Sequence, residues 1–129
     1  MAKSPCRILC VDDHADTSEM LKHLLSNEEV EVVTAVSMEE ALELAKNESF
    51  DLYVLDKRLP DGSGLDLCRN LTSITPNVPC MFYTGDAYEV HRLQALAAGA
   101  DDYVAKPDID RLIESVQKLL SDRECAAAV

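Results

Sequence analysis

Short apolar runs alternate with longer stretches of helical periodicity along most of this chain of 129 residues. Near-continuous apolar strands are typical of a parallel sheet that is buried on both faces. Strands that alternate with helices imply such a sheet with helices covering both faces. The order βαβαβαβαβα therefore predicts an α/β fold with five strands, which we expect at residues 8–11, 30–36, 52–55, 80–83 and 103–105.

The intervals between the runs carry apolar residues at helical spacing, and these stripes are expected to face the core. Ser37 and Glu40 have the spacing of a capping box at the start of the second helix, and Gly99 is placed to end the fourth. We expect a single domain over residues 1–129, with a core at about 7–121 and a loosely attached tail at 122–129. The five stripes are Met20, Leu21, Leu24 and Leu25; Met38, Ala41, Leu42 and Ala45; Leu65, Leu67, Cys68 and Leu71; Val90, Leu93, Leu96 and Ala97; and Ile109, Leu112, Ile113, Val116, Leu119 and Leu120.

The negative charge of the chain and its lack of long apolar segments exclude several classes of partner. The formal net charge is −12, and an acidic surface repels phosphate backbones, so no direct nucleic-acid binding is expected. No segment has the length of a membrane span, and no apolar stretch of signal-peptide length follows the first residues. We therefore expect a cytoplasmic domain without membrane contact.

Five cysteines occur, at positions 6, 10, 68, 80 and 125. An odd number without a Cys-x-x-Cys pair fits neither a disulfide framework nor a zinc site. Cys10 and Cys80 lie inside apolar runs, where a cysteine acts as a small buried hydrophobe. The cysteines thus indicate a reducing compartment.

Polar side chains follow four of the five predicted strands. Asp12 and Asp13 follow the first, Asp56 the third, Thr84 the fourth and Lys106 the fifth. The carboxyl ends of parallel strands meet at one edge of the sheet, where ligands of open α/β folds bind. We therefore expect these five side chains to form one site.

The residue types at this edge suit phosphoryl transfer with Mg²⁺. Carboxylates ~5 Å apart repel by about 3 kcal/mol per pair at an effective dielectric constant of ~20, so such a cluster attracts a cation. Hard oxygen ligands favour Mg²⁺. A carboxylate can act as a nucleophile toward phosphorus, and a lysine supplies charge stabilisation. Taken singly, Asp13 could be a helix cap, Lys106 a solvated lysine and Thr84 an ordinary strand residue.

These motifs together resemble the receiver domain of two-component response regulators, over about residues 7–120. The resemblance implies the doubly wound, flavodoxin-like fold with strand order 2-1-3-4-5. The residues that carry it are Val11-Asp12-Asp13, Leu55-Asp56, Leu59-Pro60-Asp61-Gly62-Ser63-Gly64, Thr84-Gly85, Gly99-Ala100-Asp101-Asp102-Tyr103 and Lys106-Pro107.

The resemblance also implies a role for each site residue. Asp56 would be the phosphoacceptor, and Mg²⁺ would be held by Asp12, Asp13, Asp56 and the backbone carbonyl of Arg58. Lys106 would pair with the phosphoryl oxygens. Thr84 and Tyr103 would act as switch residues that move when the phosphoryl group arrives. The Lys106-Pro107 bond would be cis, as an X-Pro bond tolerates.

The implied function is a signalling switch that catalyses only its own phosphoryl transfer and dephosphorylation. The donor would be a phosphohistidine on a sensor histidine kinase or a histidine phosphotransfer protein. The surface that signals to a downstream effector domain or protein would be formed by the fourth helix, the fifth strand and the fifth helix. A homodimer is possible, and the sequence leaves the oligomeric state open.

Two other functions remain to be weighed. A pseudo-receiver would keep the fold as a protein-binding module without phosphorylation, although the complete set of five site residues argues against it. A metal-dependent phosphatase with an aspartate nucleophile would need an Asp-x-Asp spacing, but Arg58 stands two residues after Asp56.

Two local features depart from, or add to, the family pattern. Asp108 follows Lys106-Pro107 at once, like a one-residue deletion in the last loop, and is expected to cap the last helix. Basic residues follow the phosphoacceptor, and we hypothesise that Arg58 pairs with Asp86 across the entrance and slows loss of the phosphoryl group.

Overall fold

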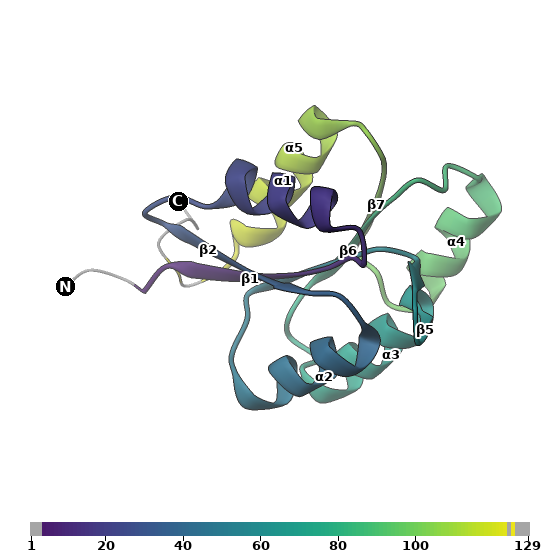
Figure 1. The fold of residues 1–129 in the computed structure, drawn as a ribbon, viewed down its shortest axis with the longest axis horizontal. Helices are drawn as coiled ribbons and strands as arrows, with labels where there is room; N and C mark the ends of the chain where they lie inside the picture. Colours follow the sequence, from purple (N-terminus) through teal and green to yellow (C-terminus); the bar gives the residue numbers. More distant parts are fainter. Residues whose placement is uncertain (1–3, 124, 126–129) are drawn as a thin grey trace.

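The protein forms a single five-stranded parallel sheet in the strand order β2-β1-β3-β6-β7. This computed structural model describes residues 4–123 and 125. A separate short hairpin of two strands, which the sequence did not predict, follows the third strand of this sheet and takes the labels β4 and β5 (Figure 1). The predicted strand order is confirmed. The strands are β1 (Cys6–Val11), β2 (Val30–Ala35), β3 (Leu52–Leu55), β6 (Cys80–Thr84) and β7 (Asp102–Ala105), and the hairpin is β4 (Arg58–Leu59) with β5 (Gly62–Ser63).

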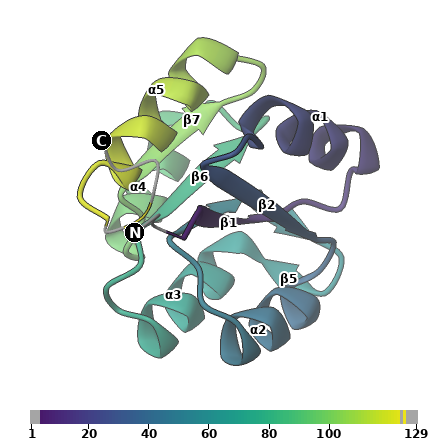
Figure 2. The ribbon, with the colours of Figure 1, turned by 90° about the vertical axis from the view of Figure 1, so that its left-hand side faces the viewer.

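Helices cover both faces of the sheet (Figure 2). One face packs against α1 and α5, and the other against α2 and α3 with the buried Ala95 of α4. None of the helices in the described part of the chain is long and apolar enough to cross a membrane. The helices are α1 (Ala15–Leu25), α2 (Met38–Asn47), α3 (Gly64–Ile74), α4 (Glu89–Ala97) and α5 (Ile109–Leu120).

Successive residues of the central strands enter opposite cores. In β1, Ile8 belongs to the core under α1 and α5, whereas Leu9 belongs to the core over α2 and α3. Both side chains are fully buried, and burial of such a side chain stabilises the fold by roughly 1.5–3 kcal/mol. This two-sided burial explains why the strands are almost continuously apolar.

The predicted helix ends are confirmed. The Ser37 hydroxyl accepts a hydrogen bond from the Glu40 amide at 3.1 Å, and the Asp108 carboxylate accepts one from the Arg111 amide at 3.1 Å. Gly99 follows α4 with φ 112°, a left-handed conformation that glycine adopts without strain. The Lys106-Pro107 bond is cis, as expected.

The fourth helix contradicts the sequence prediction. Val90 and Leu93 are 57% and 53% exposed, and Ala97 is also exposed. Ala95, outside the predicted stripe, is the buried residue of α4. The helix approaches the sheet through this small side chain, so its larger apolar residues stay on the surface.

The chain after α5 also differs from expectation. Cys6 and Cys125 form a disulfide that joins β1 to the segment following α5, although the sequence indicated reduced cysteines. Arg123 lies against Asp51 and Asn77. The described part of the predicted loose tail is therefore anchored, while residues 124 and 126–129 of that tail lie outside the described residues.

Candidate functional site

Hydrogen bonds of the parallel sheet bring the strand ends together. The Asp12 amide donates to Ala35 O at 3.0 Å, and the Asp56 amide donates to Val11 O at 2.9 Å. Between β6 and β7, the Lys106 amide donates to Thr84 O at 2.7 Å. These bonds fix the backbone of the site residues at the carboxyl edge, as the sequence predicted.

Three carboxylates meet at this edge. One oxygen each of Asp12, Asp13 and Asp56 lies, together with a ring nitrogen of His14, within a group of ligand atoms no more than 4.8 Å apart. Asp12 and Asp56 are only 2% and 6% exposed, whereas Asp13 faces solvent. Buried carboxylates at such separations repel strongly unless a cation lies nearby.

Two basic side chains offset this repulsion. Lys106 Nζ lies 2.8 Å from Asp12 Oδ2 and 3.6 Å from Asp56 Oδ2. His14 Nδ1 lies 2.9 Å from Asp12 Oδ1 and 3.2 Å from Asp13 Oδ1. The hydrogen bond with Asp12 and the charges of Asp12 and Asp13 raise the pKa of His14.

The donor set fits Mg²⁺. This ion prefers carboxylate oxygens, keeps several waters and leaves positions for phosphate oxygens. Asp12 and Asp56 supply buried ligands, and the exposed Asp13 leaves one side of the cluster open to solvent. Arg58, whose carbonyl the family resemblance adds to the set, begins β4 two residues after Asp56.

A glycine, whose structural role the sequence did not predict, lies against the loop that follows Asp56. The Gly64 amide donates to Lys57 O at 2.7 Å. A Cβ on Gly64 would lie 2.1 Å from the Asp56 carbonyl oxygen, far inside van der Waals contact. Only glycine allows α3 to begin this close to the loop.

The two expected switch residues contact the same loop. Thr84 is buried at the end of β6, and its hydroxyl lies 3.5 Å from the Asp86 amide. The Tyr103 hydroxyl donates to the Asp86 carbonyl at 2.5 Å. Burial, together with the charges of Asp86 and Asp56, raises the pKa of Tyr103 to about 12.

The predicted pairing of Arg58 with Asp86 is wrong, because Lys57 takes that place. Lys57 Nζ lies 2.9 Å from Asp86 Oδ2, and both side chains are largely buried. Arg58, in contrast, is exposed. His91 of α4 also contacts Asp86, with 2.5 Å between Nδ1 and Oδ2. The Lys57 ammonium is the main reason that the pKa of Asp86 falls to about 2.

These groups line one open cavity of about 610 Å³. Asp56, Thr84 and Lys106 lie on its walls together with Lys57 and His91. The cavity thus gives solvent access to the buried Asp56 past a rim of charged side chains. Lys57 and His91 were missed as site residues. The pairing with Asp86 was assigned to Arg58, the neighbour of Lys57, and His91 lies within α4, away from the strand ends.

A five-stranded doubly wound sheet with this acidic cluster, hydroxyl and lysine at its carboxyl edge defines a phosphoacceptor domain of two-component signalling. The chain belongs to the response regulator receiver domain family, whose model matches residues 8–117.

Curated relatives and solved structures agree with this assignment. The response regulator protein PilR of Pseudomonas aeruginosa is 40% identical over 115 residues, which cover 88% of this chain and 26% of PilR. The cell cycle transcriptional regulator CtrA of Caulobacter vibrioides is 36% identical over 101 residues, or 78% of this chain and 44% of CtrA. The chain thus spans less than half the length of these two relatives.

The fold is shared with solved receiver domains. A CheY-like receiver domain protein from Methanospirillum hungatei superimposes with a TM-score of 0.83 and 35% identity, covering 90% of this chain and 94% of that one. The BeF3-activated DrrB receiver domain gives a TM-score of 0.80 with 30% identity, covering 93% and 98% of the two chains.

Proposed function

We propose that the chain accepts a phosphoryl group from a phosphohistidine onto Asp56 in the presence of Mg²⁺. The observation that carries this proposal is the position of Asp56. Its carboxylate is buried, lies 3.6 Å from Lys106 Nζ, belongs to the acidic cluster and borders the open cavity. A carboxylate so placed is reachable by a phosphorus atom and is surrounded by the charges that phosphoryl transfer requires.

In the transfer step, an Asp56 oxygen attacks phosphorus while the bond from phosphorus to the donor histidine nitrogen breaks. Asp12, Asp13, Asp56 and the Arg58 carbonyl would hold Mg²⁺, which supplies positive charge to the phosphoryl oxygens when bound. Lys106 gives up part of its contact with Asp12 and pairs with a phosphoryl oxygen. The sheet holds all these groups in place, so little reorganisation accompanies the reaction.

The switch follows from the new charge. A phosphoryl group adds about 1.5–2 negative charges and three acceptor oxygens. We expect Thr84 to move toward Asp56 and donate to one of these oxygens. Tyr103, which contacts the Asp86 loop as Thr84 does, then changes its packing. This rearrangement biases the surface of α4, β7 and α5 between two states.

Two observations support that output surface. Tyr88, Val90 and Leu93 expose apolar side chains at α4, which a protein partner could cover. The DrrB receiver domain, which shares this fold, was solved in a BeF3-activated form. We propose a histidine kinase or phosphotransfer protein as the donor partner and an effector domain or protein as the target.

The ion pair of Lys57 and Asp86 lies where a pair of Arg58 and Asp86 was expected to slow loss of the phosphoryl group. It lies at the rim of the cavity, where a hydrolytic water must enter to attack the aspartyl phosphate. We propose that this pair narrows the approach and lengthens the lifetime of the phosphoryl group.

Incubation with acetyl phosphate and Mg²⁺, followed by intact mass measurement, tests the central proposal. The wild-type protein should gain the mass of one phosphoryl group, and Asp56→Asn should gain none. A phosphorylation-independent binding module would keep its mass unchanged under these conditions, and that result would refute the proposal.

A further inference from the structure

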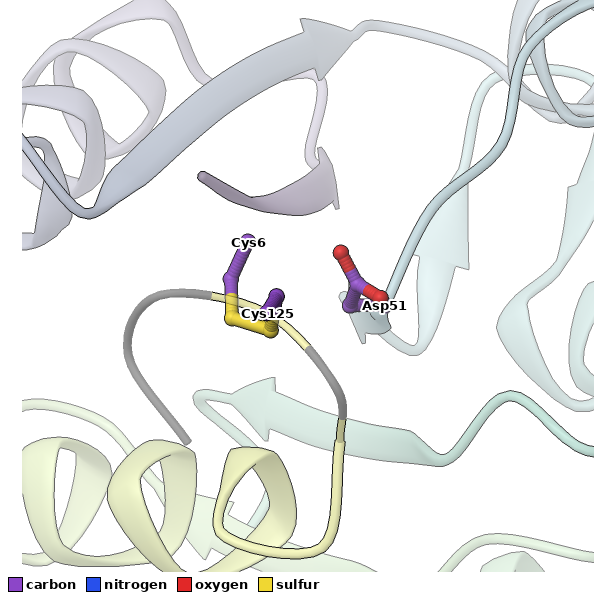
Figure 3. A group of neighbouring side chains, drawn as sticks. All are labelled: Cys6, Asp51 and Cys125. Carbon is purple, nitrogen blue, oxygen red and sulfur yellow. A yellow bond between two sulfur atoms is a disulfide. The ribbon is translucent and has the colours of Figure 1, made fainter. Parts of the chain in front are cut away.

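A covalent link lies at the edge of the sheet opposite Asp56. Cys6 begins β1 and Cys125 follows α5, and their sulfurs are bonded across 119 residues of sequence, with Cα atoms 5.0 Å apart (Figure 3). That Cα separation is within the usual range for disulfides. Both cysteines are buried, at 0% and 4% exposure.

Neighbouring polar groups hold Cys125 in position. Asp51, which lies beside the disulfide in Figure 3, accepts hydrogen bonds from the Arg7 amide at 2.8 Å and from Arg123 Nη2 at 3.3 Å. Arg123 Nη1 also donates to Asn77 O at 2.7 Å. Arg123 thus fixes the backbone two residues before Cys125, close to the disulfide.

The same three residues, Cys6, Asp51 and Cys125, have the donor atoms of a metal site. The contacts of Asp51 argue for sulfur chemistry instead. Both of its oxygens are used by Arg7 and Arg123, and a cationic guanidinium beside the group opposes a second cation.

We infer that Cys6 and Cys125 form a reversible oxidation site whose oxidant is a low-molecular-weight disulfide of the glutathione class. The chain is expected in a reducing compartment, where disulfides are usually transient and serve redox sensing rather than permanent structure. The inference concerns the edge opposite the acidic cluster and does not rest on the proposed phosphoryl transfer.

The chemistry is thiol–disulfide exchange. The Cys125 thiolate attacks one sulfur of the oxidant, forming a mixed disulfide and releasing one half as a thiolate. The Cys6 thiolate then attacks the Cys125 sulfur, forming the bond between the two cysteines and releasing the second half. The protein loses two electrons and two protons, and the oxidant gains them as two thiols.

The position of Cys125, in a short segment after the last helix, makes this pair easier to expose to an oxidant than the cysteines within the sheet and α3. Opening of the short segment after α5 requires loss of the Arg123 contacts but leaves the sheet and helices intact. Cys10, Cys68 and Cys80 lie inside secondary structure and are buried. Burial raises the pKa of the Cys10 thiol to about 12, which keeps that cysteine protonated and inert.

Oxidation would link Cys125, which follows α5, covalently to Cys6 of β1, and reduction would remove this link. Since α5 belongs to the proposed output surface, the bond would restrict how any following segment leaves that surface.

The test uses the full chain equilibrated with reduced or oxidised glutathione. The oxidised protein should be lighter than the reduced one by two hydrogens, and peptide mapping after alkylation should find Cys6 linked to Cys125. Its melting temperature should be higher by roughly 10 °C. Cys125→Ser should melt like reduced wild-type protein under both conditions, and its single change at the chain's end keeps the test valid if Cys6→Ser fails to fold.

Asp56→Asn should retain the whole redox response, which separates this inference from the phosphoryl-transfer proposal. An unchanged mass after oxidation would overturn the inference. A link between the buried Cys68 and Cys80 would overturn it as well. Stoichiometric Zn²⁺ binding by the reduced protein that is lost in Cys125→Ser would assign the group to a metal instead.

Discussion

The ammonium group of Lys57 lies 2.9 Å from a carboxylate oxygen of Asp86, and this contact joins the loop after β3 to the loop after β6. Lys57 directly follows Asp56, the proposed phosphoacceptor, and Asp86 is two residues beyond Thr84. The pair therefore connects the two loops that must move relative to each other if Thr84 approaches a phosphorylated Asp56.

Breaking this pair should shorten the lifetime of the phosphoryl group. Lys57→Met removes the charge and keeps much of the side-chain volume, so water reaches Asp56 more readily. We expect dephosphorylation to accelerate about threefold or more, equivalent to about 0.7 kcal/mol of barrier. The measurement is the decay of phosphorylated protein after the donor is removed.

Arg69→Ala provides the matched control for that experiment. It breaks an exposed ion pair with Asp66 on α3, far from the cavity lining. Equal decay rates for Lys57→Met and Arg69→Ala would show that the rim pair does not protect the phosphoryl group.

Lys106→Ala should still allow phosphorylation of Asp56 but should prevent the conformational change that follows it in the wild-type protein. Asp56 keeps its carboxylate neighbours, so acetyl phosphate still labels the protein, although more slowly. Without the ammonium group, phosphorylation no longer draws the loop after β6 toward the site. Amide NMR shifts of α4 and β7 should therefore stay close to their unphosphorylated positions, while wild-type shifts move.

Asp13→Asn should stabilise the protein in the absence of divalent cations. The substitution removes one negative charge from a cluster in which Asp12 and Asp56 are buried. We expect a gain of about 0.5–1 kcal/mol in unfolding free energy measured in EDTA. Added Mg²⁺ should raise the melting temperature of wild-type protein more than that of the variant, and an identical Mg²⁺ response would argue against Asp13 as a ligand.

The Lys57–Asp86 contact should also appear in the pH dependence of stability. The pKa of Asp86 is lowered from 3.8 to about 2 in the folded protein. A carboxyl with a depressed folded-state pKa contributes stability above its unfolded pKa and loses that contribution as the pH falls. The stability difference between wild type and Asp86→Asn, from urea denaturation, should thus shrink as the pH falls from ~4 to ~2.

Gly64→Ala should severely destabilise the fold, whereas Gly85→Ala should not. The new Cβ at position 64 would lie 2.1 Å from a backbone oxygen, but at position 85 nothing lies within 4 Å. The first change forces a backbone shift, which we expect to cost about 3 kcal/mol or more. Comparison of the two urea midpoints checks this, and similar midpoints would contradict the close approach.

The sheet and the central site could be predicted because their signals are local. Apolar runs mark the strands, and the residue after each run falls at the carboxyl edge whatever the details of packing. The position of Asp12, Asp56 and Lys106 at one edge thus followed from where the predicted strands end.

The errors concern contacts that local sequence does not determine. Lys57 and Arg58 are adjacent and equally charged, and the start of β4 decides that Arg58 faces solvent while Lys57 turns toward Asp86. The apolar stripe of α4 has ordinary core spacing, but Ala95 makes the buried contact. Cys6 and Cys125 are 119 residues apart, and no pattern in the sequence connects them.

The bond between Lys106 and Asp12 spans 94 positions of the chain. Any contiguous fragment that contains the complete site must run at least from Asp12 to Lys106, because the site residues come from the first strand, the last strand and two strands between them. Loss of β7 and α5 by proteolysis or early chain termination therefore leaves Asp12 and Asp56 without Lys106. The proposed phosphorylation of Asp56 should therefore require a chain that has been synthesised and folded through β7.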